Sequence, residues 1–143
     1  MPWLSEEDAR AFIADRHSGV LVTLKSSDGR PQLSNVAYAV IDGEVRVSVT
    51  EDRAKTANLR RDPRVSLYVT SDDFWTYVVA EGTATLSPVA QTPGDKTCGR
   101  LLEYYEAAAG KAHPDPEEFF RAMVDDRRLE VSFAIDYVYP TTS

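Results

Sequence analysis

The residues of this chain best suited to chemistry form a short basic segment, residues 51–64, in a protein with a formal net charge of −7. Five of the 16 Lys and Arg residues lie in it. They are Arg53, Lys55, Arg60, Arg61 and Arg64. The segment is typical of a short helix that follows a strand. The N–H groups at the start of a helix attract anions, especially beside cationic side chains. The segment therefore predicts a locally held phosphate in an acidic protein.

An alternative interpretation treats the basic segment as a solvated helix face whose charges pair with the acidic residues of the same segment. The residues just before the helix favour the anion site. Ser48 and Thr50 project on one side of the preceding strand, so their hydroxyl groups and the cations of the helix can converge on one anion. Asn58 lies three residues after Lys55, so the two are neighbours on one helix face.

A pair of aromatic residues, Trp75 and Tyr77, lies two positions apart in a segment with strand-like composition. We therefore expect both rings on one face of a strand. Aromatic side chains dominate protein cores and interfaces, and either role explains the pair. A flat wall against a planar ring is the functional interpretation.

The sequence offers little support for a hydrolase or for a metal site. The two histidines, His17 and His113, come without a Gly-x-Ser-x-Gly elbow, and Cys98 lies on the apolar side of a predicted helix, which argues against a hydrolase. Acidic pairs such as Asp72-Asp73 have adjacent members that point in different directions, so no metal site is expected. A single cysteine excludes an internal disulfide and a cysteine-based metal cluster.

Length and composition restrict the class of protein. At 143 residues and 43% hydrophobic content, we expect a single domain over residues 1–143. The negative net charge argues against nucleic acid as a partner, because such binding depends on neutralising phosphates. No signal peptide is visible, and no apolar stretch approaches the roughly 20 residues that span a bilayer. The expectation is a soluble cytoplasmic protein with no membrane partner.

A helix and a series of strands must position the basic segment. Ser5 followed by Asp8 resembles a capping box at the start of a helix. Before the basic segment, strands are expected at residues 19–26, 33–41 and 45–50, with turn signals at Asp28-Gly29 and Asp42-Gly43. The third strand alternates clearly, with Val45, Val47 and Val49 on one face.

After the basic segment, Pro63 ends the helix, because the residue before a proline avoids the helical conformation. Further strands are expected at residues 65–69, 75–86 and 129–138, with Gly82 as a possible bulge in the long middle one. Two helices are expected around Leu101 and Phe119, after a loop at residues 88–95. Six strands with helices packed outside predict a small antiparallel barrel, whose closure would remove exposed edges.

Three motifs resemble a known family. They are Gly29-Arg-Pro-Gln-Leu-Ser-Asn35, Arg53-Ala-Lys-Thr-x-Asn-Leu-Arg-Arg-Asp-Pro-Arg64, and Trp75-x-Tyr77 with Ala80-Glu-Gly82. Together they are similar to the split-barrel flavin/deazaflavin oxidoreductases. More narrowly, they resemble the coenzyme F420-dependent branch of the pyridoxamine 5'-phosphate oxidase-like superfamily. The resemblance runs from about Gly19 to the final strand.

The resemblance implies a mainly β protein, a six-stranded antiparallel split β-barrel with peripheral helices, which forms a homodimer with two shared cofactor sites. It assigns the cofactor phosphate to Arg53, Lys55, Thr56 and Asn58, with Ser48 and Thr50 beside them. It places Gln32, Leu33, Ser34 and Asn35 along the cofactor ring, partly through backbone groups, and brings Trp75 and Tyr77 from the other subunit. The acidic tail of F420 would meet Arg60, Arg61 and Arg128.

The implied reaction is hydride transfer from reduced F420 to an electron-poor double bond of a small organic substrate. Such a reaction requires orientation and exclusion of water more than a strong acid–base pair, which agrees with the missing catalytic motif. The alternatives are an FMN-dependent enzyme of the pyridoxamine-phosphate-oxidase type and a non-catalytic F420-binding protein.

Overall fold

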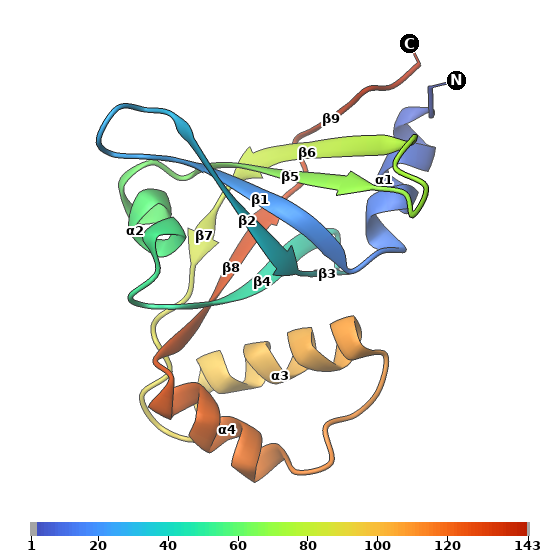
Figure 1. Cartoon of the computed structure of the whole chain (residues 1–143). Coiled ribbons are helices and arrows are strands. Elements are labelled where there is room, and N and C mark those ends of the chain that lie inside the picture. Colours follow the sequence, from blue (N-terminus) through green and yellow to red (C-terminus); the bar gives the residue numbers. More distant parts are fainter. Residues whose placement is uncertain (1–2, 143) are drawn as a thin grey trace.

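The computed structural model describes residues 3–142, which form four helices and nine strands in two antiparallel sheets (Figure 1). The helices are α1 (Glu6–Ala14), α2 (Ala54–Arg61), α3 (Lys96–Ala109) and α4 (Pro116–Asp125). The strands are β1 (Ser18–Leu24), β2 (Pro31–Ala37), β3 (Ala39–Ile41), β4 (Glu44–Thr50), β5 (Arg64–Thr70), β6 (Tyr77–Thr83), β7 (Thr85–Leu86), β8 (Arg128–Ala134) and β9 (Tyr137–Tyr139). One sheet has the order β2-β1-β5-β6-β9 and the other the order β3-β4-β8-β7.

The expected barrel of six continuous strands is wrong, because three of the six strands divide and change sheets. β2 continues into β3, β6 into β7, and β8 into β9, and the two members of each pair lie in different sheets. At each division a backbone N–H donates to a carbonyl elsewhere in the chain: Tyr38 to His17 (2.9 Å), Ala84 to Pro63 (2.8 Å), and Asp136 to Glu81 (2.9 Å). At these hydrogen bonds the chain leaves the strand pairing of one sheet and enters that of the other. The described residues therefore form two packed sheets and no closed barrel.

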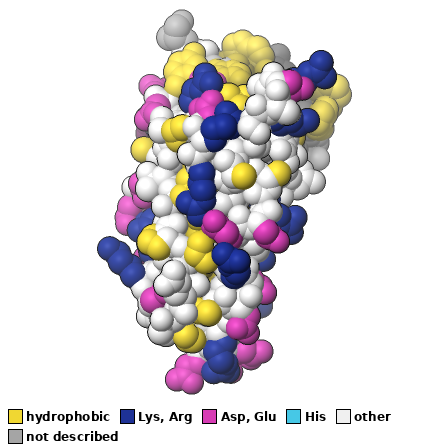
Figure 2. All heavy atoms as spheres, turned by 90° about the vertical axis from the view of Figure 1, so that its left-hand side faces the viewer, with side chains coloured by type: hydrophobic (Ala, Val, Ile, Leu, Met, Phe, Trp, Pro, Cys, Tyr) yellow, Lys and Arg dark blue, Asp and Glu magenta, His cyan; other side chains and the backbone are white. Residues whose placement is uncertain are grey.

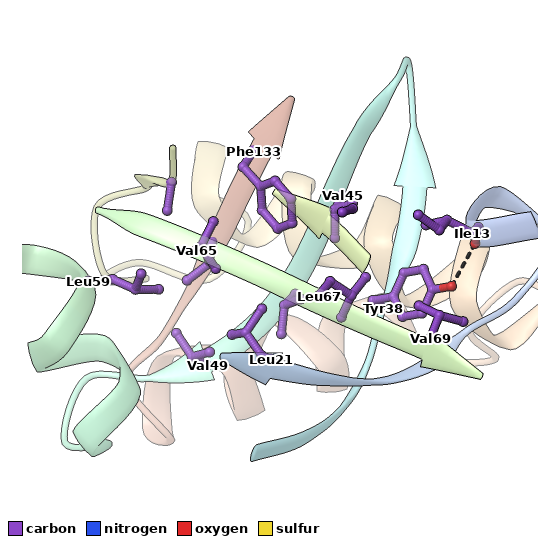
Figure 3. Packing of buried hydrophobic residues seen from close by; sticks show 14 of the residues in the cluster. Ile13, Leu21, Tyr38, Val45, Val49, Leu59, Val65, Leu67, Val69 and Phe133 are labelled. Carbon is purple, nitrogen blue, oxygen red and sulfur yellow. Dashed lines mark hydrogen bonds between the residues drawn. The ribbon is translucent and has the colours of Figure 1, made fainter. Parts of the chain in front are cut away.

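The core lies between the two sheets. The alternation predicted for β4 is confirmed, since Val45, Val47 and Val49 are all buried. Figure 3 shows Val45 and Val49 in one cluster with Leu67 of β5 and Phe133 of β8. The other face of β4 therefore carries its polar residues, and α3 and α4 lie together on one side of the sheets (Figure 1).

The predicted helix ends and the tight turn are confirmed. The Ser5 hydroxyl accepts a hydrogen bond from the Asp8 amide at 3.1 Å and caps α1. α2 ends before Asp62, which is extended as the following proline requires. Asp42 and Gly43 both have positive φ, 52° and 78°, as a two-residue hairpin turn demands. Among the described residues, the helices fall short of the length and hydrophobicity that spanning a bilayer requires.

Gly82 does not form the suggested bulge. The pairing of β5 with β6 runs without interruption past Val65 and Gly82. A Cβ at position 82 would instead lie 2.4 Å from the Ala134 carbonyl oxygen and 2.7 Å from a carbon of the Phe133 ring. Glycine is therefore needed because β6 and β8 approach each other closely there.

The outward face of the five-stranded sheet is rich in apolar side chains. Val22 of β1 lies opposite Leu33 on one side and Ser66 on the other, so the three residues share this face. Leu33 is 62% exposed, and Tyr137 on the opposite edge strand is 58% exposed. The face thus presents exposed apolar groups at both edges of the sheet, with Ser66 and Glu81 between them.

Candidate anion-binding site

Three cationic side chains meet where β4 runs into α2. Arg53 is the residue that precedes the first turn of α2, and Lys55 lies within that turn. Arg128 starts β8 and pairs with Thr50 at the end of β4, which places its side chain on the face of β4 that carries the hydroxyls. Its guanidinium donates to the Ser48 hydroxyl oxygen at 3.2 Å. One strand hydroxyl therefore meets a cation, Arg128 of β8, whose charge also acts on Lys55 at the helix start.

The start of α2 differs from the other described helix starts in having no capping side chain. Ser5, Asp95 and Asp115 each accept a hydrogen bond from the first turn of their helix, whereas Arg53 makes no such bond. The first turn of α2 also contains no acidic residue. Its amide groups consequently keep the partial positive charge that attracts anions.

The electrostatics of Lys55 are dominated by its burial and by two neighbouring cations. Burial lowers the pKa of Lys55, and the nearby charges of Arg53 and Arg128 lower it further. An anion bound among the three groups would offset both the burial and the mutual repulsion. The donor set of two guanidinium groups, an ammonium group and helix amides suits a phosphate.

Two of the residues predicted to bind the phosphate donate their side-chain hydrogen bonds to other groups of the protein. The Thr56 hydroxyl donates to the Thr50 carbonyl at 2.8 Å, and the Thr56 side chain is fully buried. The Asn58 amide donates to the Thr23 hydroxyl at 3.1 Å and to the Gln32 side-chain oxygen at 3.0 Å. These contacts join α2 to β1, β2 and β4, so Thr56 and Asn58 position the helix start.

The Thr50 hydroxyl is also engaged. It donates to the Asp52 carboxylate at 2.7 Å, and this hydrogen bond is the main reason that the pKa of Asp52 is lowered. Thr50 therefore borders the cluster with its hydroxyl proton directed to a neighbouring carboxylate, while Ser48 accepts from Arg128.

The remaining arginines of the basic segment contact other groups of the protein, as expected if this part of the helix is an ordinary solvated face. Arg60 pairs with Glu51 at 2.6 Å, and Arg64 pairs with Asp62 at 2.7 Å. Arg61 donates to the Leu24 carbonyl at the end of β1. Figure 2 shows Lys and Arg side chains interspersed with Asp and Glu on this side of the molecule. The segment therefore contains an anion-attracting start and a solvated, partly paired end.

The four predicted ring-contact residues lie together on β2 but on two faces. Gln32 and Ser34 are half-buried, whereas Leu33 and Asn35 are exposed on the opposite side. β2 is an edge strand, so the backbone groups on its outer side are unpaired within its sheet and are available to a planar ring.

The expected strand position of Trp75 is wrong. Trp75 lies in the turn between β5 and β6, where its amide donates to the Asp73 carboxylate at 3.0 Å, and its side chain is 72% exposed. Tyr77 begins β6 and stacks on Tyr68 with ring centroids 5.6 Å apart. The two rings are therefore not held together on one strand face. The turn arises because Asp73 and Ser71 hydrogen-bond to backbone groups in place of a ladder.

Sequence reasoning missed an aromatic cavity beside Arg128. A cavity of about 350 Å³ lies between β4, β8, α3 and α4. Its lining includes Ser48, Tyr104, Tyr105, Phe119, Met123 and Arg128. The helical spacing of these aromatic residues is typical of core packing and does not by itself indicate a cavity. The available signal was the alternation of β8, which places Arg128 on the face that α3 and α4 cover.

The histidines have structural partners. A ring nitrogen of His17 lies 3.0 Å from the Tyr38 carbonyl, and His113 packs against Tyr105 and Phe119. Burial raises the pKa of the Cys98 thiol, which is fully buried. Among residues 3–142 no group of three potential metal ligands lies close enough to hold an ion.

Comparison with known proteins places this geometry in a family. A family model described as pyridoxamine 5'-phosphate oxidase matches residues 5–139. A conserved hypothetical protein from Mycobacterium tuberculosis is 26% identical over 98% of this chain and 91% of its own, with a TM-score of 0.73. A structure described as an F420 reductase is 20% identical over 97% of this chain and 98% of its own, with a TM-score of 0.67. A FAD-binding protein from Mesorhizobium loti is 20% identical over 94% of this chain and 90% of its own, with a TM-score of 0.65.

The structural similarities show a common fold, and the family model covers almost the whole chain. The anion-attracting start of α2 agrees with a family that binds flavin-type cofactors. This chain belongs to the pyridoxamine 5'-phosphate oxidase family.

Proposed function

We propose that this protein is an F420H2-dependent reductase that transfers a hydride to an electron-poor double bond of a small organic substrate. The observation that carries the proposal is the group of Arg53, Lys55 and Arg128 around the uncapped start of α2. The structural neighbour described as an F420 reductase, which shares the fold, supports the choice of cofactor.

In this proposal the cofactor phosphate lies at the start of α2. Arg53, Lys55 and the first amides of the helix hold it, and Ser48 and Arg128 lie beside it. Thr56 and Asn58 keep the helix start in place through their buried hydrogen bonds. Arg60 and Arg61, which lie on the solvated end of α2, are proposed to meet the acidic tail once they exchange their present partners.

The cofactor ring is proposed to lie along β2, beside Gln32, Leu33, Ser34 and Asn35. When bound, the deazaflavin supplies the hydride. The protein orients the ring through the backbone of this edge strand and excludes water around it, which is the main requirement of such a transfer.

We further propose that two copies of the chain form a homodimer through the outward face of the five-stranded sheet. Leu33 and Tyr137 expose apolar surface on this face, and Val22 lies near its centre. Burying such surface favours association. The exposed turn with Trp75, followed by Tyr77, would then reach the ring from the other subunit. The proposed environment is the cytoplasm.

An FMN-dependent enzyme is the second candidate. The cations around Lys55 suit the phosphomonoester of FMN as well as the phosphodiester of F420. Arg60 and Arg61 already have partners within the chain, which weakens the argument that they are reserved for an acidic tail. The family model and the FAD-binding neighbour agree with a flavin.

Titration of the purified protein with F420 and with FMN distinguishes these candidates. We expect F420 to bind more tightly, and we expect Lys55→Ala to weaken binding by about tenfold or more, because a charge-assisted contact to phosphate is lost. Lys111→Ala, at an exposed position after α3, is the matched control and should bind normally.

Turnover is measured next with F420H2 and a panel of quinones and enones. Tighter binding of FMN than of F420, together with oxidation of pyridoxamine phosphate, would overturn the proposal in favour of the second candidate. Tight F420 binding with no turnover of any substrate in the panel would favour a non-catalytic F420-binding protein.

A further inference from the structure

The cavity between β4, β8, α3 and α4 has the dimensions of a small-molecule site. Its volume of about 350 Å³ falls within the range of roughly 300–1,000 Å³ that ligand pockets occupy. It lies on the outer face of the four-stranded sheet, on the opposite side of that sheet from the buried valines of β4.

The helix side of the cavity is aromatic. The rings of Tyr105 and Phe119 lie 5.5 Å apart and are inclined at 55°, and His113 packs against both. The Tyr104 ring is held in position because its hydroxyl donates a hydrogen bond to the Ala37 carbonyl at 2.8 Å. These rings form an ordered wall that suits the face or edge of another planar ring.

The sheet side of the cavity contributes a single cation. The Arg128 guanidinium is oriented by the Ser48 hydroxyl at 3.2 Å, and its Nε lies 3.7 Å from the Asp126 carboxylate. That carboxylate also lines the cavity, but it is 55% exposed, so its pairing with Arg128 is weak. A guanidinium has five donors in a fixed plane, and the remaining ones can bind a carboxylate.

We infer that this cavity binds a planar aromatic anion, with its ring against Tyr105 and Phe119 and its carboxylate on Arg128. The combination of an apolar aromatic wall with one oriented cation selects for both properties at once. The site is adjacent to the proposed cofactor phosphate and shares Ser48 and Arg128 with that region. Its aromatic wall is formed by residues that the cofactor proposal does not use, whereas Arg128 serves both sites, so the test below is made without cofactor.

The probe for this site is 2-naphthoate, titrated calorimetrically into the full-length protein without cofactor. We expect 2-naphthoate to bind more tightly than cyclohexanecarboxylate, which lacks the aromatic ring, and than 2-naphthylmethylamine, which lacks the anion. Arg128→Met should weaken 2-naphthoate binding by about tenfold or more. Met123→Trp fills the cavity from α4 and should abolish binding.

Arg121→Met, at an exposed position of α4, is the matched control and should bind as the unaltered protein does. Circular dichroism and melting temperature verify that each variant folds. Absence of 2-naphthoate binding to the unaltered protein overturns this inference. So does an Arg128→Met or Met123→Trp variant that binds 2-naphthoate as tightly as the unaltered protein does. Because F420 titration is a separate measurement, F420 binding without 2-naphthoate binding contradicts only this inference. The reverse pattern contradicts only the proposed function.

Discussion

Lys55 illustrates, at the scale of one residue, how a candidate anion-binding site can lower the stability of the fold. Its ammonium group is half-buried, and the charges of Arg53 and Arg128 add to the effect of burial in lowering its pKa. The folded protein therefore releases the Lys55 proton more readily than the unfolded chain does. Without an anion, the charged form of Lys55 opposes folding.

Lys55→Met should weaken the binding of phosphate-containing ligands. It should nevertheless raise the melting temperature of the ligand-free protein by about 1–3 °C. The gain should be complete at neutral pH and below, where Lys55 is charged in both states. It should shrink as pH rises through the lowered pKa of Lys55, because the folded protein then sheds the unfavourable charge itself.

Melting temperatures of the ligand-free variant and of the unaltered protein between neutral and alkaline pH check this expectation. Lys25→Met, in the exposed loop after β1, is the control. A Lys55→Met protein that is less stable than the unaltered protein at neutral pH would show that Lys55 has a structural role in place of the electrostatic one.

At the scale of elements, a buried network of charges joins α3 to the four-stranded sheet. Arg46 of β4 is 4% exposed and pairs with Glu103 of α3. Arg100 of α3 pairs with the fully buried Glu130 of β8 at 2.7 Å, and Arg46 approaches the same carboxylate at 4.0 Å. Burial raises the pKa of Glu130, although both arginines act in the opposite direction.

Arg46→Met should destabilise the protein by about 3 kcal/mol at neutral pH, since it leaves a buried carboxylate with one counter-charge fewer. The loss should diminish as pH falls through the raised pKa of Glu130. There the folded protein takes up a proton that the unfolded chain does not, which stabilises the folded state.

Urea unfolding at several pH values measures this effect. Arg64→Met removes a surface ion pair and should leave stability nearly unchanged. A loss in Arg46→Met that does not vary with pH would contradict the role assigned to Glu130.

Two glycines should respond in opposite ways to the same substitution. Gly82→Ala places a methyl group 2.4 Å from the Ala134 carbonyl oxygen, so β6 or β8 must move, and we expect a loss of about 2–3 kcal/mol. Gly99 lies in α3 with open space around its Cα, so Gly99→Ala should stabilise the protein by about 1 kcal/mol. Chemical denaturation of both variants checks the pair, and a stable Gly82→Ala protein would show that the strands can separate freely.

The sequence was sufficient to predict elements whose signals are local. The alternation of β4, the Ser5 cap and the Asp42-Gly43 turn each depend on neighbouring residues, and the structure confirms them. The divisions of the long strands depend on carbonyls far away in the chain, such as Glu81 for Asp136. Distant partners of this kind leave no local pattern, so three continuous strands were expected in error.

The candidate site was predictable to a similar extent. The hydroxyls before the helix and the cations at its start share one short segment, and the structure places Ser48 on β4 and both Arg53 and Lys55 at the start of α2. Arg128 is distant in sequence, and it joins these residues because β8 pairs with β4. The cavity was missed because helical spacing alone does not distinguish a residue packed in the core from one that lines a hollow.

At the scale of the whole molecule, the proposed homodimer can be tested separately. Val22→Lys introduces a charge on β1, beside the central strand of the five-stranded sheet, and should convert the proposed dimer to a monomer in light scattering. It should also weaken cofactor binding, because the partner residues are lost. Ala107→Lys, at an exposed position of α3, should remain dimeric. A Val22→Lys protein that remains dimeric would place the interface elsewhere.

The three divided strands also affect how the molecule folds. Because β2 and β3, β6 and β7, and β8 and β9 are each joined directly, each sheet contains segments whose immediate continuations lie in the other. Neither sheet can assemble or melt fully without disturbing its neighbour, so unfolding should be a single cooperative transition. The same connections pair segments that are far apart in the chain. We therefore expect loop closure, more than local strand formation, to limit the folding rate.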